Sequence, residues 1–240
     1  MPTRIEKLQA HAAHLLDAFI QLRERYALLE PMLFSKSVTK ERGSGKQARG
    51  FQILKHSLFL SCSQDIAKLT LDDDERTPSL ANLVRALSDD AVRAELREMF
   101  SVWKIPSAEE ETEPEIVEAL LRMELREEAQ RREQFDALFC DVTVLWAKLS
   151  TSTIIKGFRT IRDKVSAHTE VRFIADKYQF VDIGTLGINW GDLRSIIDEM
   201  QKLVELMGLL IRNAGFAWDR LDSQLSRASD EFWTTPSAGI

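Results

Sequence analysis

A short run of charged residues ends at a histidine in the last third of the chain. Arg162 and Asp163 precede His168 in the string GFRTIRDKVSAHTE. Arg159 and Lys164 lie beside them in the same string. The guanidinium group of an arginine can bind two phosphate oxygens at once and stays protonated. A histidine exchanges protons near neutral pH. These residue types are therefore suited to proton transfer beside a phosphate group.

The spacing of an arginine and a histidine is a weak signal by itself. Residues 4–11 and 49–56 also begin with an arginine and end with a histidine. Three features favour the later pair: an acid directly follows Arg162, Ala167 precedes His168, and the pair lies on the penultimate long helix. The alternative is that the arginine and the acid are ordinary surface charges, and that the histidine caps the last carbonyl groups of its helix.

The sequence contains none of the common catalytic or metal-binding motifs. It has no glycine-rich phosphate loop, no HExxH and no GxSxG. His11 and His14 share one face of a predicted helix without a third ligand nearby, which favours a surface or interhelical role over a metal site. Cys62 and Cys140 form no CxxC pair, which argues against a disulfide framework or a zinc site. We therefore expect neither a metal nor any other cofactor.

The composition is that of a globular protein that does not coat nucleic acid through bulk charge. The 240 residues are 44% hydrophobic and 29% charged, with a formal net charge of −6. The charge is uneven, because residues 36–55 carry a net +5, residues 155–177 a net +3 and residues 107–136 a net −7. The two basic stretches are either solvated helix faces or a local phosphate-binding patch.

No segment of the sequence predicts export or membrane insertion. The first residues lack the apolar core of a signal peptide. The longest uncharged apolar run near the end, Leu206 to Ile211, is too short to cross a bilayer. We expect a cytoplasmic protein with no membrane partner.

Apolar residues recur at helical spacing along almost the whole chain, and only ten glycines and six prolines interrupt them. We expect an all-α bundle that forms a single domain over residues 1–240, with its core over about residues 5–225. The predicted helices cover about residues 3–30, 46–69, 78–87, 88–103, 114–150, 154–168 and 189–232, with a break at 150–153. The predicted connections are a flexible basic loop at 35–50, an acidic linker at 106–114 and a short irregular or hairpin segment near 171–187.

The motif and its surroundings resemble the HEPN superfamily, and in particular its AbiU-type abortive-infection branch. The hallmark of HEPN domains is an arginine, a polar residue and, a few residues later, a histidine, as at Arg162, Asp163 and His168. The resemblance extends to the long helix before the motif, the irregular segment after it and the capped terminal helix that begins NWGDLRSIIDEM. It covers roughly residues 5–225 and implies a HEPN-like helical bundle with a long C-terminal helix.

The resemblance implies a metal-independent endoribonuclease. In this chemistry the ribose 2′-hydroxyl attacks the adjacent phosphate and leaves a 2′,3′-cyclic phosphate. His168 would transfer protons, Arg162 would stabilise the developing charge, and Asp163 would orient or tune both groups. Arg159 and Lys164 would hold flanking phosphates. The implied partner is RNA rather than DNA, in phage defence or in a toxin–antitoxin pair with an antitoxin protein.

The spacing within one helix predicts that the site is shared between two chains. Six residues along an α-helix place Arg162 and His168 about 120° apart around the axis and about 9 Å apart along it. One chain cannot easily bring both to one phosphate, whereas two motif helices packed antiparallel about a two-fold axis would do so. We therefore expect a homodimer with a composite active site.

Two other functions remain open. The main alternative is a non-catalytic HEPN-like scaffold that binds RNA, a nucleotide or a partner protein. The net acidity favours it, and so does Glu170, which places an acid close to the proposed phosphate. Some HEPN toxins carry at this position a tyrosine that a nucleotidyltransferase antitoxin modifies, so Glu170 argues against that form of regulation here. The third is a plain helical interaction protein that dimerises through exposed apolar stripes.

Overall fold

The computed structural model describes residues 3–106, 112–166, 171–174, 177–180 and 186–234. Its α-helices are α1 (Arg4–Phe34), α2 (Lys36–Arg42), α3 (Ala48–Leu71), α4 (Leu80–Leu87), α5 (Asp90–Ser101), α6 (Pro114–Thr151), α7 (Thr153–Ile161), α8 (Trp190–Arg212) and α9 (Trp218–Thr234). A short 3-10 helix, η1 (Gly45–Gln47), precedes α3, and a π-helical turn, η2 (Arg162–Ser166), follows α7. Strands β1 (Val171–Ile174) and β2 (Lys177–Phe180) form an antiparallel hairpin. The α-helices hold more than two thirds of the chain, which confirms the all-α class, and the hairpin confirms the expectation for 171–187.

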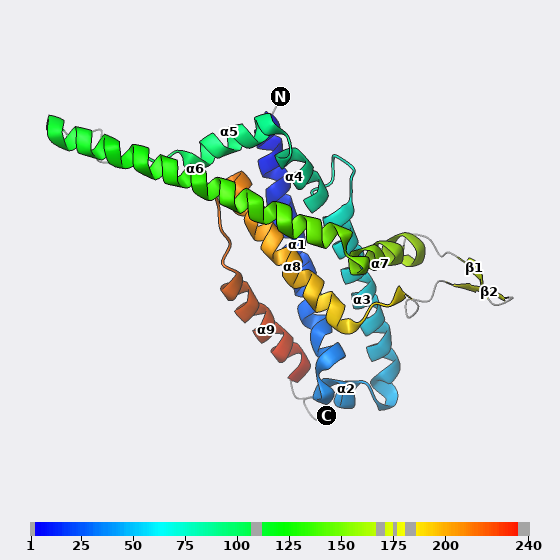
Figure 1. The fold of residues 1–240 in the computed structure, drawn as a ribbon. Coiled ribbons are helices and arrows are strands. Elements are labelled where there is room, and N and C mark those ends of the chain that lie inside the picture. Colours follow the sequence, from blue (N-terminus) through cyan, green and yellow to red (C-terminus); the bar gives the residue numbers. More distant parts are fainter. Residues whose placement is uncertain (1–2, 107–111, 167–170, 175–176, 181–185, 235–240) are drawn as a thin grey trace.

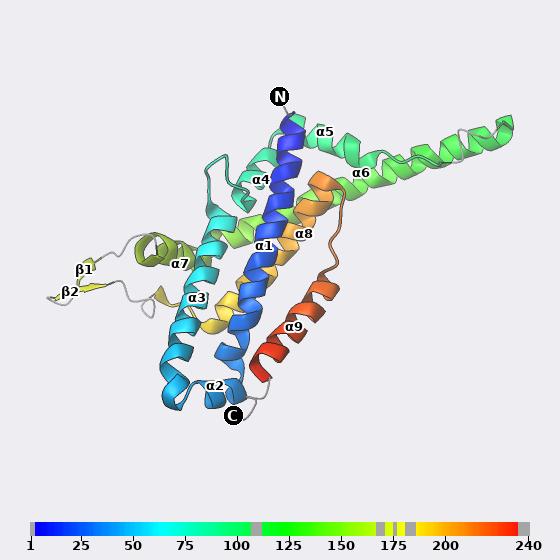
Figure 2. The same ribbon diagram turned by 180° about the vertical axis from the view of Figure 1, so that it is seen from behind.

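Helix α1 lies at the centre of the bundle, where it packs against α3, α8 and α9 (Figures 1 and 2). Its buried side chains recur every three or four residues on one face: Ile5, Leu8, Ala12, Leu15, Phe19, Leu22, Tyr26, Leu29 and Met32. Burial of one large apolar side chain stabilises the fold by about 1.5–3 kcal/mol. This face is therefore the main source of cohesion among the four helices.

Two helices begin at capping boxes. The Thr3 hydroxyl accepts a hydrogen bond from the backbone N–H of Glu6, whose carboxylate accepts one from the backbone N–H of Thr3. Asn189 and Asp192 make the same reciprocal pair at the start of α8. Each box satisfies two backbone donors that the first helical turn leaves without partners.

Helix α1 does not stop before Pro31, as the sequence suggested, but continues to Phe34. A proline inside a helix cannot donate a hydrogen bond to the carbonyl four residues earlier, here Ala27. The hydroxyl of Ser229 on α9 donates to that carbonyl at 2.7 Å, and the indole of Trp233 donates to the neighbouring carbonyl of Leu28 at 3.1 Å. Helix α9 therefore supplies the partner that the proline removes.

Two predictions, one near each end of the chain, differ from the structure. The predicted flexible loop at 35–50 contains α2 and η1, because Val38 is buried in a small cluster with Met32, Phe51 and Trp233. The predicted continuous helix at 189–232 is two helices, α8 and α9. Asn213 ends α8 in the left-handed conformation (φ 50°, ψ 40°), a common way for a helix to terminate.

Helix α6 extends well beyond the bundle at its N-terminal end (Figure 1). Leu121 and Leu125 continue the helical apolar spacing of α6, but both are more than half exposed because no other helix of the described structure covers this arm. The other end of α6 is anchored: Phe135, Val142 and Leu149 are buried. The predicted linker at 106–114 lies mostly outside the described residues.

The expected break after α6 is confirmed at Ser152, whose side chain caps α7. The chain bends by 59° between α6 and α7. In the described part of the chain no single helix has the length and apolarity to span a membrane, although this bent pair passes the same test when taken together.

We predict that Ser229→Ala lowers the free energy of unfolding by about 1–3 kcal/mol, because it leaves the partly buried carbonyl of Ala27 without a donor. In a Pro31→Ala background the same change costs less, since an alanine in place of the proline would restore the helical N–H. Urea denaturation of the four proteins gives the coupling energy. Ser223→Ala, which removes an exposed hydroxyl of α9, is the matched control. Equal effects of Ser229→Ala in both backgrounds would contradict this account.

Candidate functional site

The motif helix α7 is held by an apolar face. Ile155, Phe158 and Ile161 have no exposed surface and pack into the main core, where α7 lies against α3. Gly157 lets the chain that returns from the hairpin pass close to α7. A Cβ at this position would lie 2.8 Å from the Cδ1 atom of Ile188. The burial of one face leaves the cationic residues of α7 on the outside.

The motif begins at a change of helix type. The expected α-helix at 154–168 ends at Ile161, and residues Arg162–Ser166 form a π-helical turn. A π-turn has hydrogen bonds from residue i to i+5, so each turn holds more residues than in an α-helix. The angle and rise that we derived for an ideal α-helix between Arg162 and His168 therefore do not apply. Such turns are rare and frequently occur at functional sites.

Asp163 connects the two arginines of the motif. The Nε of Arg162 donates a hydrogen bond to Oδ1 of Asp163 at 2.7 Å. The Nε of Arg159 lies 3.6 Å from the other carboxylate oxygen. The side chain of Arg162 is 26% exposed and that of Arg159 is 59% exposed. The carboxylate thus orients two guanidinium groups, one on a mostly exposed side chain and one on a side chain that is partly buried.

Four of the five predicted site residues lie in this cluster or next to it. Arg159, Arg162 and Asp163 are in contact, and Lys164 follows directly in the π-turn. With Lys164 the cluster has three basic side chains and one acid, a net of +2. His168 lies outside the described residues, as does Glu170. The arrangement of the arginines relative to the histidine therefore stays a prediction.

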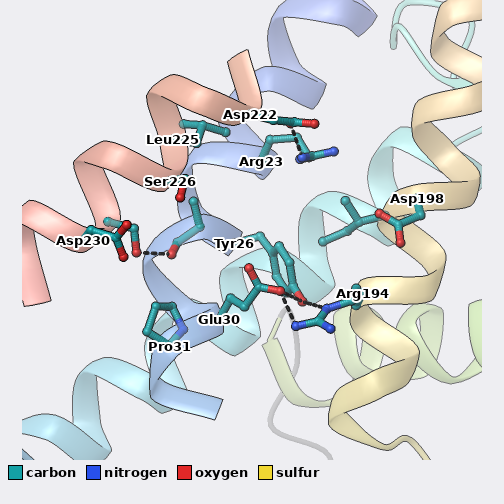
Figure 3. Close-up of a pocket in the computed structure, with 13 residues that line it drawn as sticks. Arg23, Tyr26, Glu30, Pro31, Arg194, Asp198, Asp222, Leu225, Ser226 and Asp230 are labelled. Atoms are coloured by element: carbon teal, nitrogen blue, oxygen red, sulfur yellow. Dashed lines mark hydrogen bonds and ion pairs between the residues drawn. The ribbon is translucent and has the colours of Figure 1, made fainter. Parts of the chain in front are cut away.

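A second polar cluster, which the sequence did not indicate, lines a cavity of about 290 Å³ between α1, α8 and α9 (Figure 3). The hydroxyl of Tyr26 accepts a hydrogen bond from Arg194 and donates one to Glu30. Arg194 also forms an ion pair with Glu30 at 2.5 Å. Arg23 forms an ion pair with Asp222 at 2.5 Å and a hydrogen bond with a side chain of α8.

The charges of this cavity suit a structural role rather than phosphate binding. Four acidic side chains line it, against two arginines that already contact carboxylates. Burial raises the pKa of Tyr26 to about 12, so its hydroxyl remains protonated and holds the network together. Burial also raises the pKa of Asp198. A phosphate would meet a net negative surface here.

Other chemistry has little support within the described residues. No group of three histidine, cysteine, aspartate or glutamate side chains there is arranged to hold a metal ion. Cys62 and Cys140 are free thiols. Burial raises the pKa of the Cys62 thiol to about 12, which makes it a poor nucleophile at neutral pH.

The fold and the motif cluster together define an all-α protein with a cationic site where helix α7 ends, and two further helices, α8 and α9, follow it, so the motif helix is not the penultimate one that the sequence suggested. The family model of AbiU2, a HEPN family, matches residues 5–232. This protein therefore belongs to the HEPN AbiU2 family. No curated protein and no solved structure matches the chain.

We predict that Arg23→Met destabilises the bundle by about 1–3 kcal/mol, because it leaves the acids of the cavity in Figure 3 with one arginine. The methionine keeps most of the apolar stem, so the loss reports on charge. Added salt should reduce the difference by screening the acids. The control is Arg76→Met, which breaks an exposed pair with Asp74 and should leave the thermal midpoint unchanged. An equal effect in both variants would sink the proposed role of Arg23.

Proposed function

We propose that this protein is a metal-independent endoribonuclease of phage defence or of a toxin–antitoxin system, with an active site shared across a homodimer. Membership of the HEPN AbiU2 family supports the proposal. The observation that carries it is the hydrogen bond from Arg162 to Asp163, which orients the guanidinium group of Arg162 at the end of α7. A guanidinium group held in this way is organised for phosphate oxygens before RNA arrives.

In the proposed reaction the ribose 2′-hydroxyl attacks the neighbouring phosphorus, and the bond from phosphorus to the 5′-oxygen breaks. His168 accepts the proton of the 2′-hydroxyl or donates one to the leaving oxygen. Arg162 stabilises the added negative charge of the phosphorane. Asp163 positions Arg162, and Arg159 and Lys164 bind the phosphates on either side. No step requires a metal ion.

The open face of α7 supports a site shared between two chains. The apolar face of this helix is buried against the bundle, so a second motif helix can approach only from the side that carries Arg159. An antiparallel approach about a two-fold axis would place the arginine cluster of one chain beside His168 of the other. Each dimer would then contain two equivalent sites.

One observation favours a non-catalytic scaffold as the second candidate. Asp163 contacts both Arg159 and Arg162, so part of their positive charge is neutralised before RNA binds. A scaffold that recognises RNA, a nucleotide or a partner protein needs no histidine. The two candidates therefore differ in their dependence on His168.

We predict that Arg162→Ala and His168→Ala each lower RNA cleavage by about a hundredfold. The products should end in a 2′,3′-cyclic phosphate, and a 2′-deoxyribose at the cleaved position should block the reaction. Chelators should have no effect. The matched control is Arg76→Ala, since Arg76 also pairs with a nearby aspartate at the surface. Wild-type protein that cleaves no RNA would favour the scaffold. Equal activity of all variants would show that the motif residues do not take part in cleavage.

A mixture of the two inactive variants tests whether the site is shared. A dimer of Arg162→Ala with His168→Ala has one site with both residues changed and one site with neither. Random exchange of chains should therefore restore about a quarter of wild-type activity. If both residues of a site come from one chain, the mixture stays inactive. Sedimentation of each variant checks that both remain dimers.

A further inference from the structure

Three cavities of the described structure differ in the charges that line them. The cavity of Figure 3 has twice as many acids as arginines. A second, of about 260 Å³ between α1 and α4, is basic, but its Arg4 is paired with Asp89 and its lining includes Glu75. The third, of about 480 Å³, lies between α2, the start of α3 and the end of α9 and has no acidic side chain in its lining. It is the one that suits an anionic ligand best.

The third cavity combines unpaired cations with aromatic rings. We call it the polar-end pocket, a name that refers to position and not to chemical polarity. It lies at the end of the bundle where α2 and the end of α9 are close together (Figures 1 and 2). Its lining residues are Arg42, Lys46, Gln47, Gly50, Phe51, Leu54, Phe232 and Trp233. Among the described residues, Arg42 and Lys46 have no acidic partner within ion-pair distance, so their charge remains available to a ligand.

One aromatic ring of the polar-end pocket is exposed on a rigid support. Phe232 is 56% exposed, whereas Trp233 and Phe51 are buried. The Trp233 ring contacts Phe232 edge to face at 4.9 Å and Phe51 at 6.0 Å, and its indole N–H is bound to the carbonyl of Leu28. The exposed phenylalanine can therefore receive a planar group without reorganisation of its neighbours. A nucleobase is such a group.

The backbone around the polar-end pocket also leaves room for a ligand. A Cβ on Gly50 would meet no atom within 4 Å. No side chain caps the first turn of α3, where Gln47 is the N-cap residue. The N-terminus of a helix attracts anions, and here it adds to the two cations rather than acting alone.

We propose that the polar-end pocket binds an unpaired nucleotide of single-stranded RNA, with the base stacked on Phe232 and its phosphates beside Arg42 and Lys46. A base on an aromatic ring together with a basic groove is the general mode of sequence-independent binding to single strands. A volume of about 480 Å³ falls in the range of small-molecule pockets. Paired bases of a duplex are stacked on each other and cannot enter.

The pocket is separate from the motif cluster and adds a second contact to the same substrate. Helix α3 begins at the pocket and packs further along its length against α7 and η2. A strand anchored at the pocket would be held near the cleavage site at a raised effective concentration. The inference rests on the proposed function for the identity of the ligand as RNA, but the binding itself does not require cleavage.

The test measures fluorescence anisotropy of a labelled single-stranded RNA of about 12 nucleotides with the full-length Arg162→Ala protein, in which cleavage is suppressed. In this parent, Phe232→Ala should weaken binding about 5- to 100-fold and leave the salt dependence unchanged. Arg42→Ala and Lys46→Ala should each reduce the slope of log affinity against log salt by about 0.7. Phe232→Tyr should bind as the parent does, because it keeps the ring.

Two controls separate this site from general effects. Leu125→Ala removes an apolar side chain on the α6 arm that is at least as exposed as Phe232, and Arg122→Ala removes an exposed arginine there. Neither change should alter binding. A duplex RNA of the same length should bind at least tenfold more weakly than the single strand. The inference is overturned if Phe232→Ala with Lys46→Ala binds as tightly as the parent, or if the duplex binds equally well. Wild-type protein that cleaves no RNA would contradict the proposed function. The binding measurements would still decide the present inference independently.

Discussion

Burial of the apolar face of α1 is the interaction on which the rest of the structure depends. Helices α3, α8 and α9 all pack against it, and its large buried side chains each contribute about 1.5–3 kcal/mol. The surface ion pairs contribute about 0–1 kcal/mol each, so they adjust the arrangement and do not determine it. Pro31 cannot donate a hydrogen bond to the carbonyl of Ala27, and Ser229 of α9, a helix that packs against α1, donates one instead.

The functional cluster is positioned by this core without being part of it. Helix α1 holds α3, α3 holds α7 through Ile155, Phe158 and Ile161, and the helix changes type where Arg162 begins. The residues that anchor the motif helix are therefore different from the residues that would meet RNA. Chemistry at the exposed face can be changed while the apolar face continues to support the fold.

The net charge of the chain is a poor guide to what it binds. Many acids lie in paired networks, such as the cavity between α1, α8 and α9, where arginines already neutralise part of them. The cations of the polar-end pocket, Arg42 and Lys46, lie at another end of the bundle. Because charges are screened within about 8–10 Å in physiological salt, a local cationic surface acts independently of distant acids.

The sequence alone determined the features that depend on neighbours in the chain. Helical periodicity gave the all-α class, the residues Thr3 and Asn189 marked two helix starts, and the motif string indicated the family. Features that depend on distant residues were decided only by the tertiary structure. Pro31 remains inside α1 because α9 supplies a donor, and Leu125 is exposed because no helix covers the arm. Local patterns cannot predict either outcome, because the partner or its absence lies far away in the sequence.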